Sequence, residues 1–150
     1  PMPSDIKNLT AALQAAHPLP KHTQTLPGPT GELNRLTTLP RAPILCAGPG
    51  AAAAAAQCAA IAALGGNAIS TGGQLDPAHL ATLPDFGGLI WWGDAEIART
   101  YALVLAMRPG PIIPLITGQP DVAHACLERH LCVDTTAAGG NAGLLAGQDV

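Results

Sequence analysis

The sequence predicts one small α/β domain in which a parallel sheet carries helices on both faces. Short apolar runs alternate with helical segments from about residue 43 to residue 133. These runs are apolar throughout rather than alternately polar and apolar, which is typical of strands buried on both faces of a parallel sheet. The length of 150 residues is sufficient for one domain with a hydrophobic core. Together these observations predict a small Rossmann-like architecture.

The segment before the sheet, residues 1–42, is predicted to hold one helix and a proline- and glycine-rich arm. Ser4 is a suitable N-cap, and the apolar residues of one helical face recur until Pro18 ends the pattern. Residues 17–31 then contain few large apolar side chains. We therefore expect an extended arm or linker there, and no core element.

The Rossmann-like domain proper, residues 43–130, is predicted from strand, turn and helix signals that follow one another. Gly65-Gly66 ends an alanine-rich helix, and Asp76-Pro77 combines an N-cap with a proline in the first helical turn. Two prolines in the fourth apolar run indicate a strand end or an edge strand. The predicted strands are residues 44–47, 67–70, 87–92, 111–117 and 131–133. The predicted helices are residues 51–64, a short helix between Asp76 and Pro84, a helix that begins after Asp94, and residues 121–129.

Composition and charge exclude several classes of protein. Hydrophobic residues make up 48% of the chain and charged residues 11%, so the chain is not of the disordered type. Seven basic and ten acidic side chains give a net charge of −3 with no basic stripe, which argues against a nucleic-acid partner. No apolar run reaches the ~18 residues of a membrane span. The four cysteines lack the spacing of a disulfide scaffold, so we expect a reduced, cytoplasmic protein.

A glycine-rich turn is the first candidate for a binding site. Gly48, Gly50 and Ala53 fit the G-x-G-x-x-A pattern between a strand and a helix, where glycines admit a pyrophosphate and the helix N-terminus attracts it. The acidic residue expected about 20 positions later is missing, because the second strand ends at Ser70-Thr71. We therefore interpret the turn as a vestigial site that binds no cofactor.

No catalytic or metal-binding residue is assigned to this chain. It has no G-x-S-x-G elbow and no cysteine with an obvious base. The acidic residues that precede helical runs are interpreted as caps, and adjacent Trp91 and Trp92 are expected to pack on opposite faces of the sheet. Four potential zinc ligands have poor spacing for a closed site: His124, Cys126, His130 and Cys132. We interpret the cysteines as buried structural residues and the histidines as solvated.

The C-terminal segment, residues 131–150, is predicted to hold a last strand and a docking motif. A strand runs into small residues with two adjacent glycines, a composition that allows close approach to another backbone. It has little apolar surface of its own. By physical chemistry alone this segment is either a frayed terminus or a strip that docks on a partner surface.

Two motifs resemble one protein family. Residues 131–142 (LCVDTTAAGGNA) are similar to the C-terminal motif of long proline utilization A proteins. Residues 27–34, followed by Leu39-Pro40-Arg41, are similar to the segment that enters the same C-terminal domain. Those proteins combine an FAD-dependent proline dehydrogenase with an NAD-dependent pyrroline-5-carboxylate (glutamate semialdehyde) dehydrogenase and oxidise proline to glutamate.

The resemblance implies that this chain is the extra C-terminal domain of such an enzyme. In the family this domain resembles the nucleotide-binding domain of aldehyde dehydrogenases, has lost its cofactor, and lies as a lid over the aldehyde dehydrogenase domain and its substrate tunnel. FAD and NAD are then expected only in the parent enzyme, which is cytoplasmic or peripheral at the inner membrane. Family members often have Asn at Asp134 and a hydroxyl residue at Gly143. The docking strip carried over by position is Arg129, Asp134, Thr135, Thr136, Ala137, Ala138, Gly139, Gly140 and Asn141.

Two alternatives belong to other functional classes. The glycine turn alone would suit a free-standing NAD-binding oxidoreductase domain, which predicts measurable affinity for NAD. The tail alone would suit an interaction module that docks on a partner with no link to proline metabolism.

Overall fold

The computed structural model describes residues 3–73 and 75–134, which belong to two compact units. The first unit comprises Pro1–Leu19 and Pro40–Cys126, and the second comprises Pro20–Leu39 and the chain from Leu127 onward. No helix of the described residues is long and apolar enough to cross a membrane.

The first unit is built on a four-stranded parallel sheet, as the sequence predicts. The strand order is β4-β3-β5-β6, and each neighbouring pair is parallel. All three residues of β3 and of β5 are buried, which explains why these strands are apolar throughout. The strands are β3 (Ile44–Cys46), β4 (Ala68–Ser70), β5 (Gly88–Ile90) and β6 (Leu115–Ile116).

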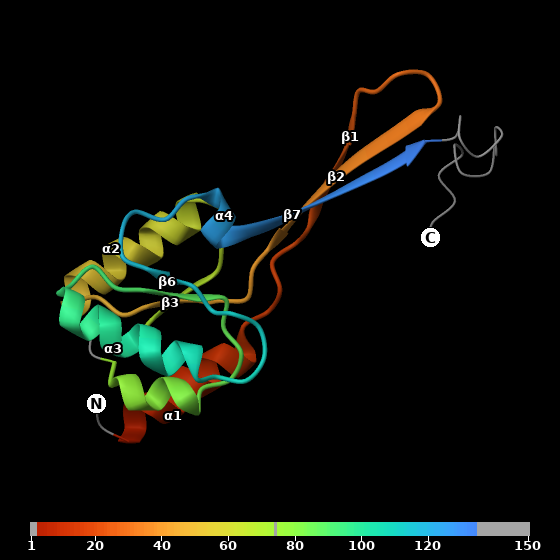
Figure 1. Cartoon of the computed structure of the whole chain (residues 1–150). Coiled ribbons are helices and arrows are strands. Elements are labelled where there is room, and N and C mark those ends of the chain that lie inside the picture. The colour runs from red at the N-terminus through yellow and green to blue at the C-terminus, as the bar shows by residue number, and fades with distance from the viewer. Residues whose placement is uncertain (1–2, 74, 135–150) are drawn as a thin grey trace. The chain divides into compact units, whose positions relative to one another are not determined.

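Helices cover both faces of this sheet (Figure 1). One face packs α2 against a core cluster that contains Ile44, Ile61 and Ile90, and the opposite face packs α1, η1 and α3 against a cluster that contains Leu45 and Leu89. Successive side chains of β3 and β5 thus point alternately into the two core clusters. The helices are α1 (Pro3–Ala15), α2 (Gly50–Ala63), the 3₁₀ helix η1 (Pro77–Ala81), α3 (Ala95–Ala106) and α4 (Val122–Ala125).

The strand order reverses at the carboxyl ends of β3 and β5. After β3 the chain moves outward to β4, then returns past β3 to form β5 and continues outward to β6. In open parallel sheets, ligands bind in the crevice outside such a point of reversal. The glycine turn follows β3 directly, so the fold places the predicted binding turn at this crevice.

A second sheet, of order β1-β2-β7, was not predicted. Its strands are β1 (His22–Leu26), β2 (Glu32–Pro40) and β7 (Cys126–Asp134). The segment 17–31, expected as an extended arm or linker outside the core, contains β1, which is extended and mostly exposed but pairs antiparallel with β2 in the register His22↔Thr38 to Leu26↔Asn34. The threonines of both strands favour an extended backbone and pair across them, as Thr23 and Thr37 do at 3.0 Å between their hydroxyl oxygens.

Two other boundaries differ from the predictions. The helix expected over residues 121–129 ends at Ala125, and β7 begins at Cys126 rather than at residue 131. Residues 127–133 show no clear helical or alternating pattern, and nearly all of them are exposed on β7, so local signals did not decide this boundary. The strand expected over 111–117 shrinks to two residues of β6, since its prolines cannot donate hydrogen bonds to a neighbouring strand.

Candidate functional site

The glycine turn after β3 has the strand–turn–helix setting that the sequence predicts. Gly48 and Gly50 both adopt positive φ angles, +97° and +76°, which side chains other than glycine rarely take. A Cβ atom at Gly48 would also lie 2.6 Å from the Gly50 nitrogen and 3.0 Å from the Gly73 Cα. Ala53 lies in the first turn of α2, so all three predicted residues are brought together.

A buried glutamine holds this turn from the helix side. Gln57 of α2 is fully buried, its Nε2 donates to the Gly48 carbonyl at 2.7 Å, and its Oε1 accepts from the Gly48 amide at 3.0 Å. The Trp92 amide donates to the same carbonyl at 2.9 Å. Both backbone groups of Gly48 are therefore satisfied within the protein. Sequence reasoning did not single out Gln57, although one amide inside an alanine helix is a detectable signal.

A second glycine loop packs against the backbone of the turn at Gly50. The loop after β4 brings the Gly73 carbonyl to the Gly50 amide, which donates to it at 3.0 Å. A Cβ atom at Gly73 would overlap the Cα and carbonyl carbon of Gly50, so the two backbones are in direct contact. In a dinucleotide site the pyrophosphate needs this close approach. The Gly50 amide, one of the donors that a pyrophosphate would need, is therefore already bonded within the chain.

The end of β4 offers no carboxylate for a ribose. Ser70 Oγ accepts from the Gly72 amide at 3.1 Å, and Thr71 Oγ1 donates to the Cys46 carbonyl at 3.2 Å. Asp76 caps η1, because its Oδ1 accepts from the Ala78 amide at 2.9 Å. The missing ribose acid and the cap role of Asp76 both agree with the sequence analysis.

Two tryptophans, Trp91 and Trp92, directly follow β5 at its carboxyl end. As predicted, they face opposite cores: Trp91 is buried beside α3, and Trp92 packs partly against the α2 side. The indole of Trp91 lies where a side chain at Gly93 would be, and its Nε1 donates to the Asp94 carbonyl at 3.0 Å. A pocket of about 270 Å³ remains beside Trp91, lined also by Gly73 and Tyr101.

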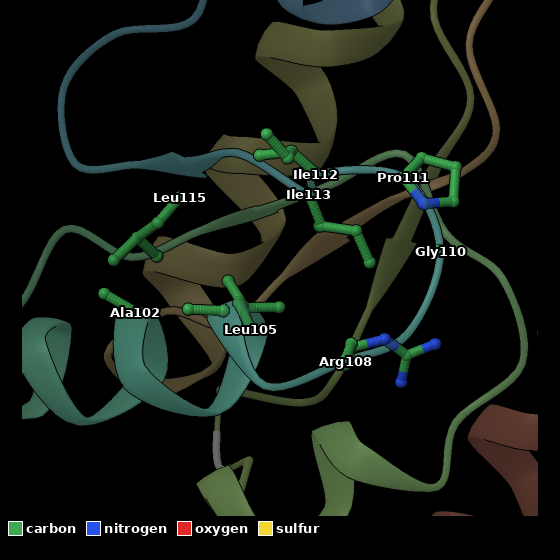
Figure 2. Close-up of a pocket in the computed structure, with 9 residues that line it drawn as sticks. Ala102, Leu105, Arg108, Gly110, Pro111, Ile112, Ile113 and Leu115 are labelled. Atoms are coloured by element: carbon green, nitrogen blue, oxygen red, sulfur yellow. The ribbon is translucent and has the colours of Figure 1, made fainter.

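A separate apolar groove of about 470 Å³ lies at the end of α3 (Figure 2). Figure 2 shows the guanidinium of Arg108 pointing away from Ala102, Leu105 and Leu115. That guanidinium donates to the carbonyls of Leu80 and Leu83, the latter at 2.9 Å, and its central carbon lies 4.9 Å from the centre of the Phe86 ring. The groove is therefore lined by aliphatic surface.

The predicted docking strip is described only at its first two positions. Arg129 and Asp134 are exposed on β7, and the strip's positions 135–141 lie outside the described residues, as does Gly143. Most of β7 from Leu127 onward is exposed, and every residue of β2 is half-buried. This sheet therefore presents accessible surface along β7.

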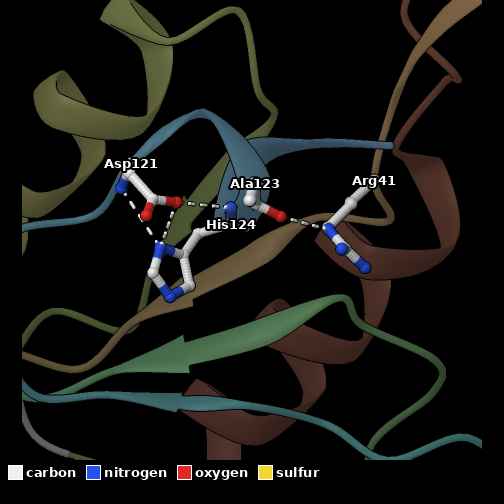
Figure 3. Close-up of polar contacts among 4 residues, drawn as sticks. All are labelled: Arg41, Asp121, Ala123 and His124. Carbon is white, nitrogen blue, oxygen red and sulfur yellow. Dashed lines mark hydrogen bonds and ion pairs between the residues drawn. The ribbon is translucent and has the colours of Figure 1, made fainter. Parts of the chain in front are cut away.

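The start of β7 is fixed by a polar cluster around α4 (Figure 3). Arg41 donates through Nε to the Ala123 carbonyl at 2.8 Å and through its backbone amide to the Ala125 carbonyl at 2.9 Å. Asp121 Oδ1 accepts from the His124 amide at 3.1 Å and lies 2.8 Å from His124 Nδ1. These bonds tie the segment after β2 to the segment before β7.

The other cysteines and histidines do not assemble into a metal site in the described part of the chain. Cys126 Sγ donates to the Leu64 carbonyl at 3.6 Å within the core, while His130 and Cys132 are exposed on β7. Burial, together with the neighbouring Cys58 thiol, raises the pKa of the Cys46 thiol well above its usual value. A protonated, buried thiol is a poor nucleophile.

The fold and site define an α/β module whose dinucleotide-type turn is hydrogen-bonded to a loop of its own backbone. The bifunctional protein PutA of Escherichia coli K12 is 34% identical to the chain over 143 residues, and that of Salmonella typhimurium LT2 is 32% identical. Each alignment covers 80% of this chain and 11% of the relative. The chain is thus a homologue of part of the PutA proteins, and it spans about a tenth of their length.

Two solved structures are similar to part of the chain. A crystal structure of a bifunctional proline utilization A (PutA) protein matches with a TM-score of 0.49 and 23% identity, covering 75% of this chain and 14% of that chain. A mutant PutA from Bradyrhizobium japonicum gives the same values. No family model matches the chain.

Proposed function

We propose that this chain is a non-catalytic domain of a bifunctional proline-catabolic enzyme that acts as a lid over the aldehyde dehydrogenase domain and its substrate tunnel. The observation that carries the proposal is the contact of Gly73 with the Gly50 amide in a chain homologous to part of PutA. A glycine turn whose Gly50 amide is already bonded to the chain, and which lacks the ribose acid, supports a scaffold that no longer binds a dinucleotide. We infer that its Rossmann-like shape derives from the aldehyde dehydrogenase superfamily.

The exposed second sheet supports the docking part of the proposal. β7 carries Arg129 outward and leads into the small-residue motif at positions 135–141. An arginine offers five donors for carbonyls or carboxylates on a facing domain. The polar cluster at Arg41 and His124 fixes where this strand starts. We propose that the strip contacts the aldehyde dehydrogenase domain of the same polypeptide and helps to retain the intermediate.

The cofactor and location assignments follow from the same proposal. FAD and NAD belong to the dehydrogenase domains of the parent enzyme, and this chain holds neither. We place the parent in the cytoplasm or at the inner membrane as a peripheral protein.

The test uses a PutA-type enzyme that carries this chain, from which residues 129–150 are deleted. We expect coupled conversion of proline to glutamate to slow severalfold, while proline oxidation measured with a dye acceptor changes little. The matched point variants are Arg129→Ala and His130→Ala, which lie on opposite faces of β7. Only Arg129→Ala is expected to slow the coupled reaction. Unchanged coupled kinetics in the deletion variant would refute the lid.

A free-standing NAD-binding oxidoreductase domain is the competing function. The tight turn at Gly48 and Gly50 favours it, because a functional dinucleotide turn uses glycines in the same strand–turn–helix setting. NAD binding at this turn would require the hydrogen bond between the Gly50 amide and the Gly73 carbonyl to break. Saturable NAD binding by the 150-residue chain distinguishes it from the lid.

A further inference from the structure

Two of the four cysteines lie on facing elements of the core beneath α2. Cys46 ends β3, and its side chain belongs to the core cluster between the sheet and α2. Cys58 of α2 packs against the same cluster. All four cysteines are free thiols. The interface between β3 and α2 therefore contains a pair of thiols from two different segments.

The register of α2 against β3 brings these two thiols together. At the glycine turn, Gln57 bonds to both backbone groups of Gly48. Beyond the end of α2, the Asn67 carbonyl accepts from the first amide of β3 at 2.8 Å, so the helix runs back along the strand. Cys58 follows Gln57 directly and therefore lies opposite Cys46, and the two side chains share a hydrogen bond.

The two thiols differ in their access to solvent. Cys46 is fully buried, and this burial, with a smaller effect of Cys58, raises the pKa of its thiol well above the usual value. Cys58 is only partly buried, so a small oxidant can reach its sulfur. An accessible thiol beside a second thiol is a common arrangement at redox-sensitive sites, where the first reacts and the second resolves the product.

We propose that Cys46 and Cys58 form a site of reversible disulfide formation, at which Cys58 reacts first with a peroxide and Cys46 resolves the product. The Cys58 thiolate attacks one peroxide oxygen, the O–O bond breaks, and a sulfenic acid and hydroxide form. The Cys46 sulfur then attacks the Cys58 sulfur, the S–O bond breaks, and the hydroxyl leaves as water with the Cys46 proton. Two thiols and one H₂O₂ thus give one disulfide and two waters. Neither cysteine belongs to the strip proposed to dock, so either proposal can fail alone.

Tryptic mapping of the 150-residue chain after treatment with hydrogen peroxide tests this pair. Cys46 and Cys58 are the only cysteines of one tryptic peptide, residues 42–99, because no lysine or arginine lies within it before its last residue. The other two cysteines lie on separate peptides. After the remaining thiols are alkylated, we expect peptide 42–99 to carry no alkyl group and to be lighter than its reduced form by two hydrogens. Dithiothreitol should restore both thiols.

Cys58→Ser and Cys132→Ser are the matched variants. Cys58→Ser removes the accessible thiol, and Cys46 should then stay reduced over the same time. Cys132→Ser removes an exposed thiol on β7 and should leave the disulfide unchanged. A peptide 42–99 in which both thiols can still be alkylated would overturn the proposal. A disulfide from either cysteine to another peptide would overturn it equally.

Thermal unfolding gives a second measurement of the same bond. The disulfide constrains the unfolded chain over residues 46–58, so the oxidised chain should melt about 5 °C above the reduced chain. The Cys58→Ser variant, treated with peroxide in the same way, should show no rise. A melting temperature of the oxidised chain that stays the same or falls would show that the core must rearrange to form the bond, which would contradict the contact of the two thiols.

Discussion

Gln57 connects the helix α2 to the glycine turn through one side chain. Gln57→Leu keeps the size of the side chain but leaves the buried Gly48 amide without its acceptor. An unsatisfied buried amide costs about 1–3 kcal/mol, so we expect the free energy of unfolding to fall by about 2 kcal/mol. Urea denaturation measures this change. Gln14→Leu on the exposed face of α1 is the control and should stay within about 0.5 kcal/mol of the parent.

Ionisation of Tyr101 is expected to lower the stability of the fold at alkaline pH. Tyr101 is buried, its hydroxyl donates to the Leu75 carbonyl at 2.6 Å, and burial, with the charge of Asp76, raises its pKa to about 12 from 10.0. The unfolded chain therefore loses this proton first, so stability is complete below pH 10.0 and falls as the pH rises through about 12.

Tyr101→Phe removes both the hydrogen bond and this titration. At neutral pH the variant should be less stable by about 1–2 kcal/mol. The difference should shrink between pH 10.0 and about 12, as the parent loses up to about 2 kcal/mol that the variant does not lose. Chemical denaturation at several pH values measures it. Parallel pH curves for the two proteins would contradict the burial of this hydroxyl.

At the scale of elements, substitutions at two neighbouring glycines test whether the loop after β4 contacts the glycine turn. Gly72 and Gly73 have similar φ angles, +75° and +78°, but a Cβ atom meets nothing within 4 Å at Gly72 and overlaps Gly50 at Gly73. Gly72→Ala should cost about 1–2 kcal/mol for the left-handed backbone alone. Gly73→Ala should cost about 1–3 kcal/mol more, because the loop must move off the turn. Equal unfolding energies for the two variants would show that the loop does not lie on Gly50.

The elements that the sequence predicts well are those with local signals. The apolar runs at Ile44–Cys46 and Gly88–Ile90, and the caps Asp76, Asp94 and Asp121, all lie where local patterns put them. The place of β7 in the second sheet escaped prediction because its pairing is non-local: β2 ends more than eighty positions before β7 begins. The hairpin of β1 and β2 is local, and its threonine-rich strands around a glycine- and proline-containing turn are a signal that the sequence does carry.

At the scale of the whole molecule, half of the candidate site was predictable. The turn at Gly48 and Gly50 and the missing ribose acid follow from the sequence, since both depend on residue type and spacing. The closure of the turn by Gly73 does not, because it needs the contact of two loops about 23 positions apart. The tail motif suggested the PutA relationship that the comparisons support over 80% of this chain.

The central claim is that this α/β module no longer binds a dinucleotide, and equilibrium titration of the 150-residue chain with NAD and NADH tests it most directly. We predict no saturable binding up to millimolar cofactor, since the Gly73 carbonyl already accepts from the Gly50 amide. Saturable binding in the micromolar range, weakened by Gly50→Val, would contradict the claim. That result would restore the turn after β3 as a working cofactor site.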